Sequence, residues 1–144
     1  MVTAEGELQL SISSDPVPKL QPDEVLVRIE ASPINPSDLG LFFGSVRFHE
    51  HVDPAAVKVN ESSNPRVAAP IPPARHAGMK ARYGQAMQVG NEGAGTVVNA
   101  GSDAAAQALM GKTVAILGGA MYSQWTCTIA TIPSFNIHSL STPS

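Results

Sequence analysis

Alternation of apolar and polar residues predicts strands in the first part of the chain. The clearest pattern lies at Glu24–Ala31. There Val25, Val27 and Ile29 fall on one face of an extended backbone, while a leucine and two charged residues fall on the other. A shorter alternation predicts another strand at Glu7–Ser11.

The stretch Val89–Ala100 joins a glycine-rich loop to a further strand. Three of the residues from 90 to 95 are glycines, which permit positive φ and close approach of another backbone. Asn91 and Glu92 lie between these glycines, and β-branched residues from Thr96 onward are expected to enter a sheet. Such a polar pair either mounts a site on the scaffold or is two solvated residues of a hairpin, and the local pattern leaves both open.

Short helices are predicted at three places. A helix over Pro36–Phe43 has its proline in the first turn, where the missing N–H costs nothing. Ala74–Met87 follows two prolines and predicts a helix with a basic side, although two internal glycines weaken it. Ser102 is a candidate N-cap for a helix over Asp103–Met110, which Gly111 would end.

The remaining segments divide into strands and irregular chain. Thr113–Leu117 is predicted as a strand of the buried type and Tyr122–Ala130 as another, with a turn at 118–119 between them. Apart from the helix near its end, Ser45–Gln88 has many prolines and no sustained period, so it is expected to be a long loop. Residues 131–144 are expected to form an irregular tail.

Composition indicates one strand-rich domain. At 144 residues and 15.0 kDa, with 43% hydrophobic and 15% charged residues, the chain is long enough to bury a core. Twelve prolines and twelve glycines favour a turn-rich β domain over a helical bundle. A net charge of −3 offers no attraction for nucleic acid or an anionic membrane. Without a membrane span or a signal-peptide core, the expected location is cytoplasmic.

The common nucleotide- and metal-binding patterns are absent or incomplete. The glycines at 90–95 lack the G-x-G-x-x-G spacing and precede a strand, whereas that fingerprint follows one. Cys127 is the one cysteine and is expected to be a small buried side chain on a strand. His49 and His51 have no evident third ligand, so a solvated loop is favoured over a metal site there. His76 is expected at the surface.

Three segments together resemble a known family: Glu24–Gly44 (EVLVRIEASPINPSDLGLFFG), Val89–Gly101 (VGNEGAGTVVNAG) and Lys112–Ile116 (KTVAI). Their order is similar to that in the N-terminal, GroES-like catalytic domain of the medium-chain dehydrogenase/reductase superfamily, in its zinc-free quinone oxidoreductase and enoyl reductase branch. The resemblance implies a mainly β fold with a few short helices, a partly open barrel, over residues 1–130 with a long insertion at 45–88. In the family, a Rossmann domain that carries NADPH forms the opposite wall of the cleft.

The resemblance also implies a site. Asn35 and Asn91 stand where the zinc-containing branch has a cysteine and a histidine, and amides are poor zinc ligands, so no metal is expected. Asn35 and Asp38 are the implied catalytic residues, and Asn35, Ser37, Asn91 and Glu92 are implied to bind the cofactor. Asn35 would donate a hydrogen bond to a substrate carbonyl or to the carboxamide of the cofactor.

One family feature is missing from its usual place. Enoyl reductases of this group have a tyrosine soon after the Asn-Pro-x-Asp motif, where this chain has phenylalanines. Tyr83 is a candidate substitute as a catalytic residue, and a packing role for it stays open.

The leading hypothesis is therefore the substrate-side domain of a zinc-free, NADPH-dependent oxidoreductase acting on a quinone, an enone or another small carbonyl compound. The family continues into a Rossmann domain where this chain ends, so the chain is expected to be either a truncated or partial gene product or a natural stand-alone domain, and the sequence leaves both alternatives open. The chain alone is expected to be inactive and to bind no cofactor tightly, with that domain or another copy of the chain as its partner. A non-enzymatic binding or self-associating module is the alternative, and a metal-binding domain through His49 and His51 ranks third.

Overall fold

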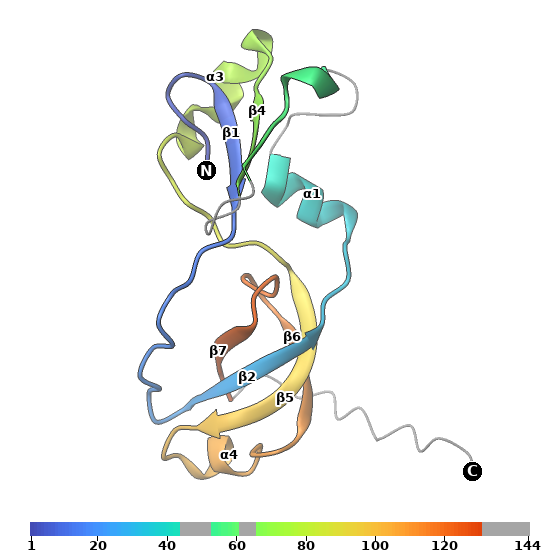
Figure 1. Cartoon of the computed structure of the whole chain (residues 1–144). Coiled ribbons are helices and arrows are strands. Elements are labelled where there is room, and N and C mark those ends of the chain that lie inside the picture. The colour runs from blue at the N-terminus through green and yellow to red at the C-terminus, as the bar shows by residue number, and fades with distance from the viewer. Residues whose placement is uncertain (44–52, 61–65, 131–144) are drawn as a thin grey trace, which may run out of the picture. The chain divides into compact units, whose positions relative to one another are not determined.

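A computed structural model describes residues 1–43, 53–60 and 66–130, which form two compact units (Figure 1). Among these residues, unit 1 holds 1–15, 36–43, 53–60 and 66–87, and unit 2 holds 16–35 and 88–130. Each unit contains one antiparallel sheet, and within the described chain neither sheet closes into a barrel. The prediction of a mainly β fold with a few short helices is confirmed, whereas a single domain over 1–130 with an insertion at 45–88 stays a prediction.

Unit 2 is built on a four-stranded sheet in the order β6-β5-β2-β7 (Figure 1). Val27 lies opposite Val97 on one side and opposite Thr126 on the other, so β2 is a central strand. The strands are β2 (Glu24–Ala31), β5 (Glu92–Ala100), β6 (Thr113–Leu117) and β7 (Trp125–Ile129), and the helix of this unit is α4 (Ala104–Gln107).

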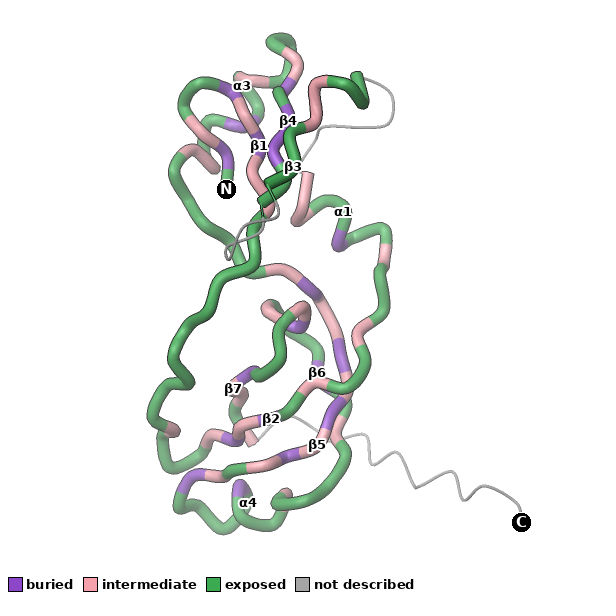
Figure 2. The backbone as a smooth tube through the Cα atoms, viewed as in Figure 1, coloured by how far each residue is buried: buried purple, intermediate pink, exposed green. Residues whose placement is uncertain are grey.

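The core of unit 2 follows the alternation that the sequence predicted. Val25 and Val27 are 1% and 0% exposed and Ile29 packs against the same cluster, while Arg28 and Glu30 face solvent. Buried and less buried positions alternate along β2 and β5 (Figure 2), as expected for strands with one face on a core. The remaining buried members of the cluster come from β5, α4, β6 and the chain that precedes β7: Val97, Ala106, Ile116 and Met121.

Unit 1 contains a three-stranded sheet in the order β1-β4-β3. Its strands are β1 (Glu7–Ser11), β3 (Lys58–Asn60) and β4 (Arg66–Pro70), and its longest helix is α1 (Pro36–Phe43). A small core forms from Val2, Leu8, Ile71 and Met79. The predictions of β1 and of α1 are confirmed at the residues stated.

The prediction that the chain before the basic helix is a long loop is wrong in two places, because β3 and β4 form there. β4 is the central strand of its sheet and pairs with both β1 and β3, and a short helix, η1 (Pro54–Ala56), precedes β3. Small alanines give β4 no strong apolar alternation, and its stability comes from hydrogen bonds on both edges, which local pattern does not reveal.

The helix predicted at Ala74–Met87 is also wrong in form. The chain makes three single turns instead, η2 (Pro73–Arg75), α3 (His76–Met79) and η3 (Lys80–Arg82), and then extends at Tyr83. A bridge between Tyr83 and Val2 draws this residue into an extended pairing, which ends the helical run. His76 is half-buried rather than at the surface, because its Nε2 contacts the carbonyl oxygen of Ile71 at 2.8 Å.

Several bounds in unit 2 differ from the expectation. β5 begins at Glu92, earlier than the expected Thr96, because Glu92 to Gly95 pair with β6. In β6 only Ile116 is buried, so the prediction of a buried-type strand is wrong: β6 lies at the sheet edge. β7 begins at Trp125 rather than at residue 122.

The predicted helix at Asp103–Met110 is reduced to the single turn α4. Asp103, not Ser102, occupies the N-cap position, and its side chain makes no capping hydrogen bond. The helix ends at Gln107 with its C-cap at Ala108, so the prediction that Gly111 ends it is wrong. Gly111 follows the next turn, where it has a φ of +71°.

Candidate functional site

Two of the predicted site residues are brought into direct contact in unit 2. Asn35 follows β2 and Glu92 opens β5, 57 positions later, and Asn35 Nδ2 donates a hydrogen bond to Glu92 Oε1. Both side chains are half-buried, so the pair is partly shielded from water yet open to a ligand. A hydrogen bond to a carboxylate is stronger than one between neutral groups.

Two more hydrogen bonds hold the segment that carries Asn35. Ser32 Oγ donates to the backbone carbonyl of Glu92 at 2.7 Å. Tyr122 Oη donates to the carbonyl of Pro33 at 2.9 Å. The segment 32–35 is therefore attached both to β5 and to the connection between β6 and β7.

Gly90 explains why Tyr122 lies there. The N–H of Met121 donates to the Gly90 carbonyl at 3.2 Å, and the N–H of Tyr122 donates to the Val89 carbonyl at 3.0 Å. Gly90 has a φ of +99°, and a Cβ at this position would lie 2.5 Å from the backbone nitrogen of Tyr122. Only glycine permits this crossing of the two backbones.

Asn91 completes the polar group at the start of β5. Its backbone carbonyl accepts a hydrogen bond from the N–H of Gly118 at 2.8 Å, which fixes the turn after β6 beside it. The prediction that Asn91 and Glu92 form a polar pair at the start of a strand is confirmed. Their binding roles stay predictions.

The other predicted site residues belong to unit 1. Ser37 and Asp38 lie in the first turn of α1, where Ser37 is exposed and Asp38 is fully buried. Tyr83 Oη donates to the carbonyl of His76 at 3.3 Å, and its ring packs against the small core of this unit. These contacts fit the packing interpretation of Tyr83, and its catalytic role, like those of Ser37 and Asp38, stays a prediction.

Sequence reasoning missed Tyr122 as a member of the site. Placed within a predicted strand, this residue was expected to pack in a sheet, but it lies in the connection before β7. The two glycines after β6 lie close to Tyr122 in the sequence and mark a turn, so they could have indicated that Tyr122 belongs to a loop rather than to a strand.

Metal binding and thiol chemistry find little support in the described part of the chain. No group of three or more His, Cys, Asp or Glu side chains there could hold a metal ion. His49 and His51 lie outside the described residues. Cys127 is on a strand, as predicted, but is only half-buried; burial and the negative charge of Glu24 raise the pKa of its thiol, which keeps it protonated at neutral pH.

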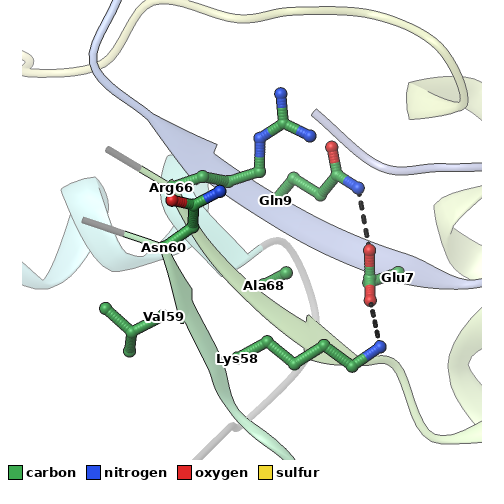
Figure 3. Close-up of a pocket in the computed structure, with 7 residues that line it drawn as sticks. All are labelled: Glu7, Gln9, Lys58, Val59, Asn60, Arg66 and Ala68. Atoms are coloured by element: carbon green, nitrogen blue, oxygen red, sulfur yellow. Dashed lines mark hydrogen bonds and ion pairs between the residues drawn. The ribbon is translucent and has the colours of Figure 1, made fainter. Parts of the chain in front are cut away.

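A separate polar hollow of about 220 Å³ lies on one face of the unit 1 sheet (Figure 3). Glu7 accepts a hydrogen bond from Gln9 Nε2 at 2.8 Å and faces Lys58 Nζ at 3.5 Å. The hydrogen bond from Gln9 and the charge of Lys58 lower the pKa of Glu7. Much of the charge in this hollow is thus compensated within it. Its lining is Glu7, Gln9, Lys58, Val59, Asn60, Arg66 and Ala68.

Comparisons with known proteins give a distant likeness. No family model and no curated protein matches the chain. A solved structure from Mesorhizobium loti, described as "a putative NADPH:quinone reductase", matches over 79% of this chain at 23% identity and a TM-score of 0.45. The match spans 25% of that protein's length. At these values the likeness decides neither family nor activity, so membership of the superfamily stays a prediction from the motifs.

No helix among the described residues is both long and apolar enough to span a membrane.

Proposed function

We propose that this chain is the substrate-side part of a zinc-independent, NADPH-dependent oxidoreductase that reduces a quinone, an enone or a related small carbonyl compound in the cytoplasm. The observation that carries this proposal is the hydrogen-bonded pair of Asn35 and Glu92 at the start of β5. The motif resemblance assigns this place to the nicotinamide and the substrate. An amide next to a carboxylate suits polar organic groups and is a poor ligand set for zinc.

The residues fit one end of the cofactor. The Asn35 carboxamide has donor and acceptor atoms, as does the nicotinamide carboxamide of NADPH, which supplies the hydride when bound. The sequence has no G-x-G-x-x-G fingerprint to bind the pyrophosphate. We therefore expect weak cofactor binding and no turnover from this chain by itself, and we propose that a Rossmann domain or another copy of the chain completes the cleft.

The test is a titration of isotope-labelled chain with NADPH and, separately, with a tetrasubstituted quinone, which cannot alkylate Cys127 by addition to its ring. Weak but saturable shifts of the NMR signals of Asn35, Asn91 and Glu92 would support the proposal, provided that Asn35→Ala abolishes them. Asn99→Ala is the matched control, because Asn99 is an exposed asparagine further along β5. Unchanged spectra at millimolar ligand, or NADPH oxidation by the chain alone, would contradict this account.

A self-associating module is the second candidate, and exposed apolar side chains of unit 2 favour it. Trp125 and Ile129 share one face of β7, where they are 37% and 48% exposed. Exposed apolar residues on an edge strand favour association with another chain. A discrete oligomer in light scattering at low protein concentration, lost in Trp125→Thr, would support this candidate, and a monomer at all concentrations would exclude it.

A further inference from the structure

We propose that Glu92 is a positioning residue that fixes the orientation of the Asn35 carboxamide. The meaning of this role for catalysis rests on the proposed function, whereas the orientation itself is a property of the chain alone. Three observations carry the proposal: the donor and acceptor chemistry of the pair, the attachment of Glu92 to the sheet, and the attachment of the segment 32–35 to Glu92 and Tyr122.

The chemistry of the pair permits one orientation. A carboxylate only accepts hydrogen bonds, so the Nδ2 end of Asn35 faces Glu92 Oε1. Rotating the amide by half a turn would place its carbonyl oxygen against the carboxylate, two acceptors that repel each other. Glu92 therefore directs Asn35 Oδ1 away from itself.

Glu92 is itself held in place. It lies opposite Leu117 in the pairing of β5 with β6, and its backbone carbonyl accepts the hydrogen bond from Ser32 Oγ. One residue thus contacts both ends of the segment 32–35, at Ser32 through its backbone and at Asn35 through its side chain. The hydrogen bond from Tyr122 to Pro33 fixes the middle of the same segment.

This arrangement has a consequence for ligand choice. A ligand group that meets Asn35 Oδ1 must offer an N–H or O–H donor, as the nicotinamide carboxamide does. A bare substrate carbonyl is an acceptor and does not match that atom. The geometry thus favours the cofactor carboxamide over the substrate carbonyl as the partner of Asn35 Oδ1.

Side-chain amide NMR tests the orientation on the chain as it is. In the unmodified chain we expect nuclear Overhauser contacts between the Asn35 Nδ2 protons and the Glu92 side chain, and a hydrogen-bonded shift of one of these protons. Their absence would overturn the proposal, and this measurement needs no variant. Glu92→Leu removes the acceptor and should abolish the contact with residue 92 and the hydrogen-bonded shift of the Asn35 Nδ2 proton, while Glu92→Gln keeps an acceptor oxygen and should retain the shift. Equal Asn35 signals in the Leu variant and the unmodified chain would also overturn it.

NADPH titration separates this inference from the proposed function. We expect Glu92→Leu to weaken NADPH binding about five- to tenfold, the effect of one lost hydrogen bond, and Glu92→Gln to recover most of it. If the Leu variant binds NADPH as well as the unmodified chain does, the positioning role is wrong while the proposed function stands. If the unmodified chain shows the Asn35–Glu92 contact but binds no NADPH, the proposed function fails and the orientation stands.

Discussion

Gly90→Ala should strongly destabilise unit 2, because a Cβ at Gly90 would collide with the backbone of Met121 and Tyr122. Two costs add. Gly90 has a φ of +99°, which an L side chain adopts only with strain. The added methyl group would also lie 2.5 Å from the Tyr122 nitrogen and 2.9 Å from the Met121 carbonyl carbon, and backbone atoms have little freedom to move aside.

The magnitude follows from these two terms. Placing alanine at positive φ costs about 1–2 kcal/mol. Forcing a methyl group into a filled space costs about 1–3 kcal/mol more. The sum, about 2–5 kcal/mol, is a large part of the roughly 5–15 kcal/mol that stabilises an ordinary domain.

Gly111→Ala is the matched control. Gly111 also has a positive φ, +71°, but a Cβ there would meet nothing within 4 Å, so only the backbone strain applies. Urea unfolding followed by the fluorescence of Trp125, the one tryptophan and a residue of unit 2, gives both changes in the free energy of unfolding. Equal losses in the two variants would refute the argument that the crossing backbone excludes a side chain at Gly90.

Three further predictions concern the cores, the pH response and the site. The pKa of Glu7 is lowered in the folded chain, mainly by its hydrogen bond with Gln9. The Glu7 carboxylate therefore stabilises the fold at pH values above the unfolded-state pKa, and this contribution is lost as the pH falls through the folded-state pKa. The free energy of unfolding should therefore fall more steeply on acidification for the unmodified chain than for Glu7→Gln, and parallel curves would contradict this. Val27→Ala should lower the free energy of unfolding in urea by about 2–3 kcal/mol, because Val27 is fully buried. Leu117→Ala, at an exposed position, should lower it by less than about 0.5 kcal/mol. Similar losses in the two variants would count against the described core. Tyr122→Phe removes one hydrogen bond to a backbone carbonyl and should cost about 1 kcal/mol, with altered NMR signals at the nearby segment that carries Asn35; an unchanged spectrum there would argue against the bond.

The sequence was a good guide where a segment's own residues decide its structure. The alternation along β2 predicted both the strand and its buried face, since side chains on a strand alternate whatever its neighbours are. Pro36 predicted the start of α1 for a similar local reason, the fixed φ of proline. The polar pair of Asn91 and Glu92 was also found, because the glycines around it indicate a loop that leads into a strand, although β5 begins at Glu92, before the β-branched residues.

The tertiary structure decided what depends on partners far along the chain. β4 is a strand because β1 and β3 satisfy its backbone on both edges, which a run of small residues does not reveal. The hydrogen bond from Asn35 to Glu92 joins positions 57 residues apart, so no local pattern could predict it. Tyr122 enters the site because backbone hydrogen bonds place its segment over Gly90. Local residue preferences thus determined elements such as β2 and α1, whereas long-range hydrogen bonding and packing determined β4 and which side chains meet.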